Sequence, residues 1–179
     1  MALRNADEHL GDWDLIFTET FVPFELFETY RKMMRTFDAK RRFSYLDLAP
    51  CYASCMTSFF LNRKSVGKYA ALIRGKWSAG IPIDLHVRRL LRAGELRAFV
   101  TVPFLTSISP ENNQSSIRGE LDTSRQVCDV FRRGFFVDAD VSGLLDEMRR
   151  LTEGAGVSPL TQLYLSGYAF SCSDRYVEF

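Results

Sequence analysis

The hydrophobic positions of the first forty residues change from a strand-like to a helix-like spacing. The run Asp14–Val22 crowds Thr and Phe into a short segment, which favours a β-strand. Pro23 is tolerated in the first turn of a helix. Large apolar residues recur at helical spacing from there: Phe24, Phe27, Tyr30, Met34 and Phe37. We expect a helix that ends in an exposed basic turn at residues 38–42, but the pattern over residues 22–37 also allows strand pairing as far as Phe27.

The stretch 44–77 predicts two apolar helices joined by a basic elbow. The first is expected to begin at Asp47, a good N-cap, with Pro50 in its first turn. Its wide apolar face would comprise Cys51, Tyr52, Cys55, Met56, Phe59 and Phe60. Residues 62–65 form the elbow, where Ser65 can cap the second helix, which ends at Gly75. The stripe of that helix would be Val66, Tyr69, Leu72 and Ile73.

Helix and strand patterns both occur in the remaining chain. Asp84 can cap a short helix that ends at Gly94, and residues 95–104 are a strand candidate. Residues 107–116 are expected to be a polar loop, because Pro, Asn, Gln and Ser dominate them. Asp140 can cap a helix over residues 141–151 that closes at two glycines. Further strands are predicted at Ile117–Asp122, Gln126–Val137, Thr161–Cys172 and Arg175–Phe179.

These elements together predict an α+β fold. Residues 13–179 would form a single globular domain, in which a twisted antiparallel sheet packs against several helices. The sheet would take its strands from the first strand and the C-terminal half, and the helices would gather in the middle. Residues 1–12 are polar and acidic, and we expect them to be a flexible N-terminus.

The net charge of +1 conceals a split along the chain. Residues 31–97 hold 15 Lys or Arg against 4 Asp or Glu, a net charge of +11, and the remainder has a net charge of −10. Such segregation can steer an anionic partner to one face, or let copies of the chain attract one another head to tail. The alternative is that the two segments neutralise each other within the fold.

Basic clusters are the polar features that most suggest a binding function. Our candidate contacts are Lys40, Arg41, Arg42, Arg63, Lys64, Lys68, Arg88, Arg89 and Arg92, and Arg74 with Lys76 forms a further cluster. Near an anionic membrane each such residue contributes ~1 kcal/mol. The aromatic residues close by could insert at a headgroup layer or stack on bases, or they could belong to the core. These rings are Phe37, Phe43, Tyr45, Phe59, Phe60, Tyr69 and Trp77. A binding role requires the basic residues to share an outer surface.

The sequence shows no clear pattern for catalysis, metal binding or a membrane span. The chain has two histidines, and His86, within an Arg-rich helix, is interpreted as a solvated or capping residue. One Cys-x₃-Cys spacing does not make a zinc site, and no phosphate-cradling glycine loop or Gly-x-Ser-x-Gly elbow occurs. Asp138 and Asp140 could form a metal-binding pair, but Asp140 also fits a helix cap. We predict no catalytic residue, metal or cofactor, and expect an intracellular protein with neither a signal peptide nor a transmembrane segment.

One stretch resembles a known family. Tyr45-x-Asp47-x-Ala49 leads into the first apolar helix, Arg63-Lys64 follows, and Tyr69 lies in a second helix that breaks near Gly75. This is similar to the central part of rhabdovirus matrix proteins, over about 35 residues, and the order of the later elements is compatible. Animal members carry a Lys-rich arm and a proline-rich late motif that are not present here, so the short N-terminus fits a plant-infecting member better.

The resemblance implies a structural protein of the virion and host cytoplasm, peripheral at the inner membrane face. It would bind the inner leaflet, condense the viral ribonucleocapsid or RNA, and self-associate as a homo-oligomer during budding. Arg41, Arg42, Arg63, Lys64 and Lys68 would be its contacts, by charge and position. The alternative hypothesis is a small non-enzymatic adaptor or host-directed effector that binds a protein partner through an aromatic patch. An enzyme would need His86 or a cysteine gathered with carboxylates in a pocket.

Overall fold

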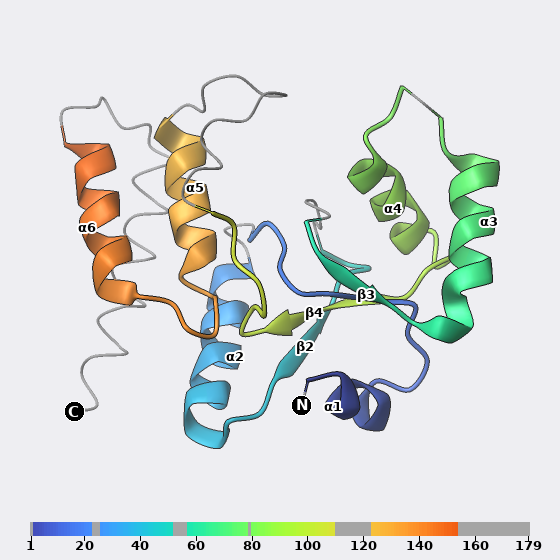
Figure 1. The fold of residues 1–179 in the computed structure, drawn as a ribbon, viewed down its shortest axis with the longest axis horizontal. Coiled ribbons are helices and arrows are strands. Elements are labelled where there is room, and N and C mark those ends of the chain that lie inside the picture. The colour runs from blue at the N-terminus through green and yellow to red at the C-terminus, as the bar shows by residue number, and fades with distance from the viewer. Residues whose placement is uncertain (1, 23–25, 52–56, 79, 110–122, 154–179) are drawn as a thin grey trace.

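The computed structural model describes residues 2–22, 26–51, 57–78, 80–109 and 123–153, and Figure 1 shows their arrangement. The strands expected at Ile117–Asp122, Thr161–Cys172 and Arg175–Phe179 lie outside the described residues, as does most of the polar loop. Residues 107–109 of that loop form neither helix nor strand.

A four-stranded mixed sheet forms the centre of the fold, in the order β2-β4-β1-β3. The strands are β1 (Leu15–Phe17), β2 (Ser44–Asp47), β3 (Phe59–Leu61) and β4 (Ala98–Val102). The α+β class predicted from the sequence is confirmed. The expected antiparallel pairing holds for β2 with β4 and for β1 with β3, but is wrong for the central pair, because β1 and β4 run parallel. Several helices separate these two strands along the chain, which is long enough for a parallel crossover.

The strands β1 and β4 come from the first strand and the C-terminal half, as predicted, but β2 and β3 come from the middle of the chain, where helices were expected. Residues expected to be a strand at Gln126–Val137 instead form most of helix α5 (Thr123–Arg133). Cys128, Phe131 and Phe135 recur at intervals of three and four, which is a helical spacing.

The expected central helix is also wrong. The strand β2 ends at Asp47, where the helix was expected to begin, residues 48–51 form neither helix nor strand, and Phe59 and Phe60 belong to the strand β3. Residues 52–56 lie outside the described part. Asp47 does not cap a helix; its Oδ1 accepts the N–H of Ala49 at 2.8 Å in a local turn. Phe59 packs inward on Phe17, with ring centroids 5.8 Å apart, whereas Phe60 is exposed. This alternation is that of a strand, and the aromatic run concealed it.

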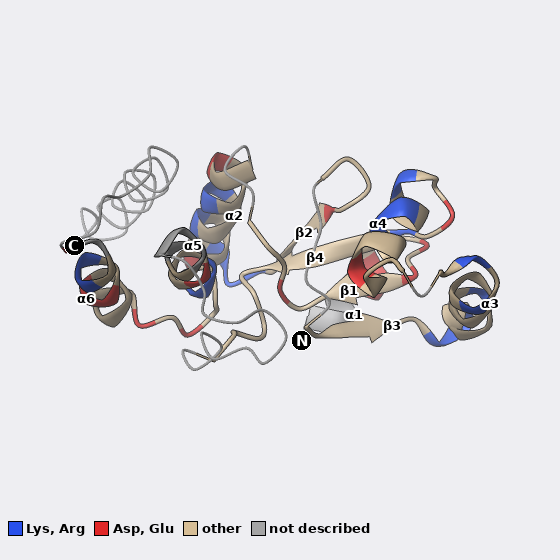
Figure 2. Cartoon of the chain, turned by 90° about the horizontal axis from the view of Figure 1, so that it is seen from above, with Lys and Arg blue, Asp and Glu red and all other residues tan. Residues whose placement is uncertain are grey.

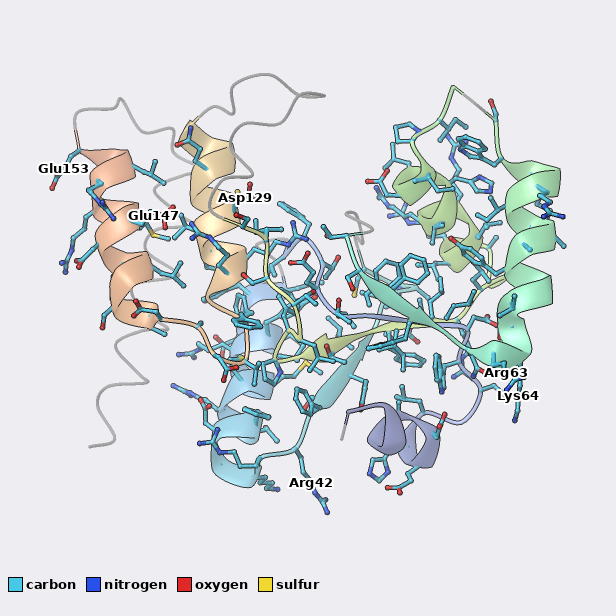
Figure 3. The ribbon with its side chains drawn as sticks, viewed as in Figure 1. Arg42, Arg63, Lys64, Asp129, Glu147 and Glu153 are labelled. Carbon is cyan, nitrogen blue, oxygen red and sulfur yellow. The ribbon has the colours of Figure 1, made fainter. Side chains whose placement is uncertain are left out.

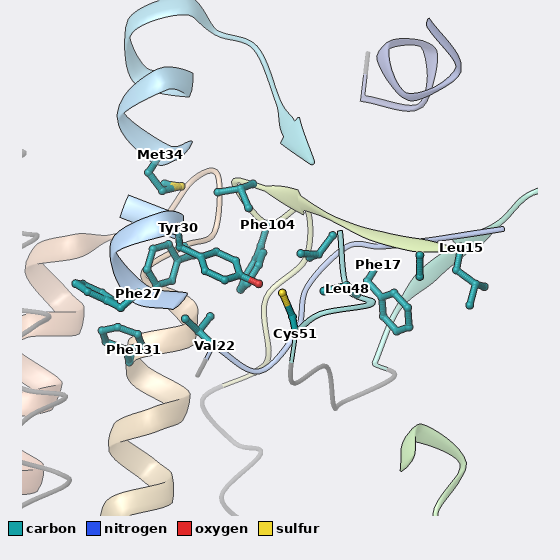
Figure 4. Packing of buried hydrophobic residues seen from close by; sticks show 14 of the residues in the cluster. Leu15, Phe17, Val22, Phe27, Tyr30, Met34, Leu48, Cys51, Phe104 and Phe131 are labelled. Carbon is teal, nitrogen blue, oxygen red and sulfur yellow. The ribbon is translucent and has the colours of Figure 1, made fainter. Parts of the chain in front are cut away.

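The main core lies on one face of the sheet. Helix α2 (Phe27–Lys40) buries four residues of its predicted apolar stripe, Phe27, Tyr30, Met34 and Phe37, while Phe24 lies outside the described residues. The helix runs through Lys40, so the turn expected at residues 38–42 is helical over residues 38–40. The ring of Tyr30 lies 5.7 Å from that of Phe104 (Figure 4). It lies 5.3 Å from the ring of Phe135. Helix α5 adds Phe131, whose ring is 4.8 Å from that of Phe27. The core therefore joins the sheet to α2 and α5.

Helix α6 (Val141–Thr152) packs beside α5. The cap predicted at Asp140 is confirmed, because its Oδ1 accepts the N–H of Gly143 at 3.1 Å. In both views α2, α5 and α6 gather at one end of the sheet, and the helices α3 (Val66–Lys76) and α4 (Ile83–Arg92) lie at the other end (Figures 1 and 2).

The second face of the sheet carries a smaller cluster. Ala6, Trp13, Ile16 and Phe99 are buried there, with Ala6 contributed by helix α1 (Ala2–His9). The indole Nε1 of Trp13 donates to Asp7 Oδ1 at 3.1 Å. The N-terminus thus forms a helix, where the sequence suggested a loose segment.

Candidate functional site

A large excess of positive charge lies at the end of the sheet where β3, α3 and α4 are found. We call residues 59–92 the basic unit; they include eight Lys or Arg and one acidic residue, Asp84, for a net charge of +7. In Figure 2 the basic residues of this unit colour both helices blue. The unit is anchored through α4, whose Val87, Leu90 and Leu91 are buried in the main core.

A short turn holds Arg63 and Lys64 at the surface. These residues belong to the 3₁₀ turn η2 (Arg63–Ser65), which precedes α3. Asn62 fixes the turn, because its Oδ1 accepts the N–H of Lys64 and its Nδ2 donates to the carbonyl of Trp13, both at 3.0 Å. Its own N–H donates to the Asp14 carbonyl at 2.9 Å. The backbone of the turn is therefore tied to the start of β1, while both basic side chains are exposed (Figure 3).

Lys68 is tied to the fold by a buried carboxylate. Its Nζ lies 2.7 Å from Asp14 Oδ2, which also accepts the N–H of Arg97 at 2.8 Å. Burial raises the pKa of the Asp14 carboxyl, but hydrogen bonds from Lys68, Ser65 and Arg97 outweigh it, so the pKa lies below its ordinary value. Lys68 thus fastens α3 to β1, which leaves Arg63 and Lys64 as the freer contacts of this turn.

Helix α4 carries the last three candidate residues. Arg89 and Arg92 are exposed and Arg88 is half-buried. Gly94 follows the helix at a φ of +69°, as the sequence predicted. The predicted cap at Asp84 is wrong, because Pro82 is the N-cap and Asp84 lies within the first turn of the helix. His86 is buried, so its interpretation as a solvated residue is wrong.

The basic C-terminal end of α2 lies apart from the basic unit. Lys40, Arg41 and Arg42 are exposed there, and the Arg41 guanidinium lies 5.6 Å from the centre of the Phe37 ring. Figure 3 shows Arg42 on one side of α1, with Arg63 and Lys64 on the other. The structure therefore divides the nine candidates: six share the basic unit and three lie at the end of α2.

Neutralisation within the chain accounts for part of the charge. Lys68 pairs with Asp14 and Lys76 with Glu95, so two cations of the basic unit have acidic partners outside it. Within the described part, no ion pair involves Arg63 or Lys64. Of the two pairs, only Lys68 with Asp14 joins the positive segment to the rest of the chain, because Glu95 lies within residues 31–97. The neutralisation interpretation therefore holds for this one pair, and attraction of an anionic partner stays a prediction.

The basic unit also carries exposed apolar side chains. Among the described residues the exposed large hydrophobic side chains are Phe60, Val66, Trp77 and Ile83, all between residues 59 and 92. Of the seven rings considered from the sequence, Phe37 is buried and Phe43, Tyr45, Phe59 and Tyr69 are half-buried, while Phe60 and Trp77 are exposed. Val66 was expected on a buried stripe, and 48% of it is exposed. Helix α3 buries none of its residues and lies at the periphery (Figure 1).

The buried polar groups elsewhere have structural roles. Arg132 Nη2 of α5 lies 2.9 Å from Glu19 Oε1 and 2.8 Å from Thr57 Oγ1, and the two charged side chains are almost fully buried. Sequence reasoning missed this pair, because no local pattern links residues so far apart. The Cys51 thiol donates to the Asp47 carbonyl at 3.2 Å, and burial raises its pKa, which disfavours the reactive thiolate.

In the described part of the chain, no group of three or more His, Cys, Asp or Glu side chains is placed to hold a metal ion. None of the helices in that part combines the length and apolar character needed to cross a bilayer. No known protein family matches the chain, and no curated protein or solved structure is significantly similar to it. The described residues thus place exposed basic and exposed apolar side chains together in the basic unit.

Proposed function

We propose that this chain is a viral matrix-type structural protein. It binds the inner, anionic face of a membrane and the viral ribonucleocapsid, and it self-associates during assembly and budding. Its place would be the virion and the host cytoplasm, peripheral at the membrane. The observation that carries the proposal is the basic turn: Arg63 and Lys64 are exposed on a backbone that Asn62 fixes to β1, within a unit of net charge +7.

The energetics of such a surface suit an anionic bilayer. Each Lys or Arg near the surface contributes ~1 kcal/mol, and the contribution decays within a Debye length of ~8 Å at physiological ionic strength. Arg63, Lys64, Arg74, Arg89 and Arg92 are exposed. A few of these in simultaneous contact would supply a binding free energy of several kcal/mol, which salt would weaken.

Two separate basic places support two polyanionic partners. The end of α2 and the basic unit lie on opposite sides of α1, so one could contact the membrane while the other contacts ribonucleocapsid (Figure 3). Self-association would follow from the opposite charges on different segments of the chain. Self-association of this kind predicts a sedimentation coefficient that rises with protein concentration at low salt and rises less at high salt.

Charge reversal tests the proposal. Arg63→Glu combined with Lys64→Glu should abolish sedimentation with vesicles of phosphatidylserine and phosphatidylcholine and leave the circular dichroism spectrum unchanged. Arg149→Glu with Arg150→Glu is the matched control, because both residues are exposed on α6 and the change in net charge is the same. If both double variants lose binding equally, net charge alone explains it and the basic turn is not the contact.

The adaptor hypothesis keeps one supporting observation, the exposure of two aromatic rings, Phe60 and Trp77. An adaptor that used them would bind a protein partner with little dependence on salt and would ignore vesicles. The charge-reversal pair would then have no effect on its binding.

A further inference from the structure

The connection between α3 and α4 holds an aromatic ring at the surface in a fixed orientation. Trp77 caps the end of α3, where its N–H donates to the Ile73 carbonyl at 3.1 Å, and 44% of the residue is exposed. Its indole Nε1 donates to the Ile81 carbonyl at 2.8 Å, across a turn in which the Ile81 N–H donates to the Ser78 carbonyl. Ile83, also exposed, begins α4 directly after this turn.

This hydrogen bond changes what the ring can contact. An indole N–H that loses water without gaining a partner costs free energy, which usually keeps one edge of a tryptophan wet. Here the N–H already has a partner within the chain, as does the Ile81 carbonyl. The apolar ring can therefore leave water without stripping an unsatisfied polar group into an apolar medium.

The charges around the ring specify the kind of partner. Arg74 and Lys76 lie in the last turn of α3, directly before Trp77, and are exposed, although Lys76 also pairs with Glu95. A tryptophan with aliphatic neighbours and flanking cations suits the boundary of an anionic bilayer, where rings sit at headgroup level and cations meet phosphates. A protein partner would be expected to pair with a few of these cations through acidic side chains at fixed positions. It would not require the excess of positive charge that is spread over the whole basic unit.

We propose that Trp77 and Ile83 are the lipid anchor of the domain: the Trp77 ring and the Ile83 side chain enter the headgroup boundary of an anionic bilayer, and Arg74 and Lys76 contact the phosphates. The inference rests on the proposed membrane role and adds the inserted side chains to it. Because α3 separates this anchor from Arg63 and Lys64, the helix would lie along the surface with contacts at both ends.

Tryptophan fluorescence provides the test, because the chain has two tryptophans and Trp13 is buried on the second face of the sheet. The Trp13→Phe variant reports Trp77 alone, and the Trp77→Phe variant reports Trp13 alone. On adding anionic vesicles, the emission of Trp77 should shift to shorter wavelength and be quenched by brominated phosphatidylcholine, while that of Trp13 stays unchanged. Should Trp13→Phe fail to fold, the difference between the wild-type and Trp77→Phe spectra carries the same information.

Affinity gives a second readout. Trp77→Ser should weaken vesicle binding about tenfold or more, as expected when one large apolar side chain no longer moves from water into the bilayer. Phe60→Ser is the matched control: Phe60 is exposed too, but it pairs across the sheet with Ile16, on the side that α1 covers. Sedimentation with vesicles without a change in Trp77 emission would overturn the anchor and leave the proposed function standing. Absence of sedimentation would overturn both.

Discussion

Single residues hold the basic unit to the sheet, and Asp14 is the most connected of them. Its buried carboxylate joins Lys68 of α3, Ser65 of the preceding turn and the backbone of Arg97. The sequence shows Asp14 only as an acidic residue before a strand, because its partners are more than fifty positions away. A cap such as Asp140 could be predicted, since its partner is three residues on.

Replacing Asp14 by Asn should destabilise the fold in a pH-dependent way. The folded pKa of Asp14 lies below its ordinary value of 3.8, so the ionised carboxylate stabilises the fold above that value and its contribution is lost as the pH falls through the folded pKa. We expect the free energy of unfolding to fall by about 1.5–3 kcal/mol at neutral pH, typical of hydrogen bonds to a charged group. Urea denaturation should show the gap between variant and wild type narrowing below about pH 4. A constant gap down to about pH 2 would contradict this account.

Breaking the ion pair of Glu19 and Arg132 should lower the free energy of unfolding far more. Arg132→Ala leaves a buried carboxylate without its partner, which is expected to cost about 3–5 kcal/mol. Arg149→Ala removes a pair exposed to water and should cost at most about 1 kcal/mol. Denaturant titration of both variants compares the two, and equal losses would show that the buried pair does not stabilise the fold.

At the scale of elements, the sequence predicted segments whose signals are local. The helices α2, α3, α4 and α6 and the strand β4 were found from the spacing of their apolar residues. Of the predicted caps only Asp140 makes its hydrogen bond, because Ser65 makes no side-chain cap bond and Pro82 takes the place expected for Asp84. The strand β3 was taken for a helix end, because three consecutive apolar residues carry no clear period and only their pairing with β1 shows alternation. The helix α5 was taken for a strand, because Val and Phe suit both and packing against α2 decides between them.

The cap of α6 can be tested against its metal-binding alternative. Asp140→Ala should lower stability by about 1 kcal/mol, because the Gly143 N–H loses its acceptor. Asp138→Ala, exposed and outside the helix, is the control and should change stability little. Thermal unfolding measured with and without magnesium or calcium checks both points. A rise in melting temperature with the ion, abolished by either substitution, would favour the metal pair over the cap.

At the scale of the whole molecule, the charge split becomes a spatial arrangement. Counting residues showed an excess of positive charge between residues 31 and 97, but it could not show that Lys68 and Lys76 pair with acids or that the end of α2 lies apart from the basic unit. Nor could it show that the exposed hydrophobic side chains accompany the remaining cations. These facts depend on the path of the chain in three dimensions, which its composition does not record.

The proposal rests most directly on one property of the unmodified protein, its response to vesicle charge and salt. We predict that it sediments with vesicles containing phosphatidylserine at low salt, progressively less as the salt concentration rises, and far less with vesicles of phosphatidylcholine alone. Equal sedimentation with both kinds of vesicle at every salt concentration, or no sedimentation with either, would contradict the account.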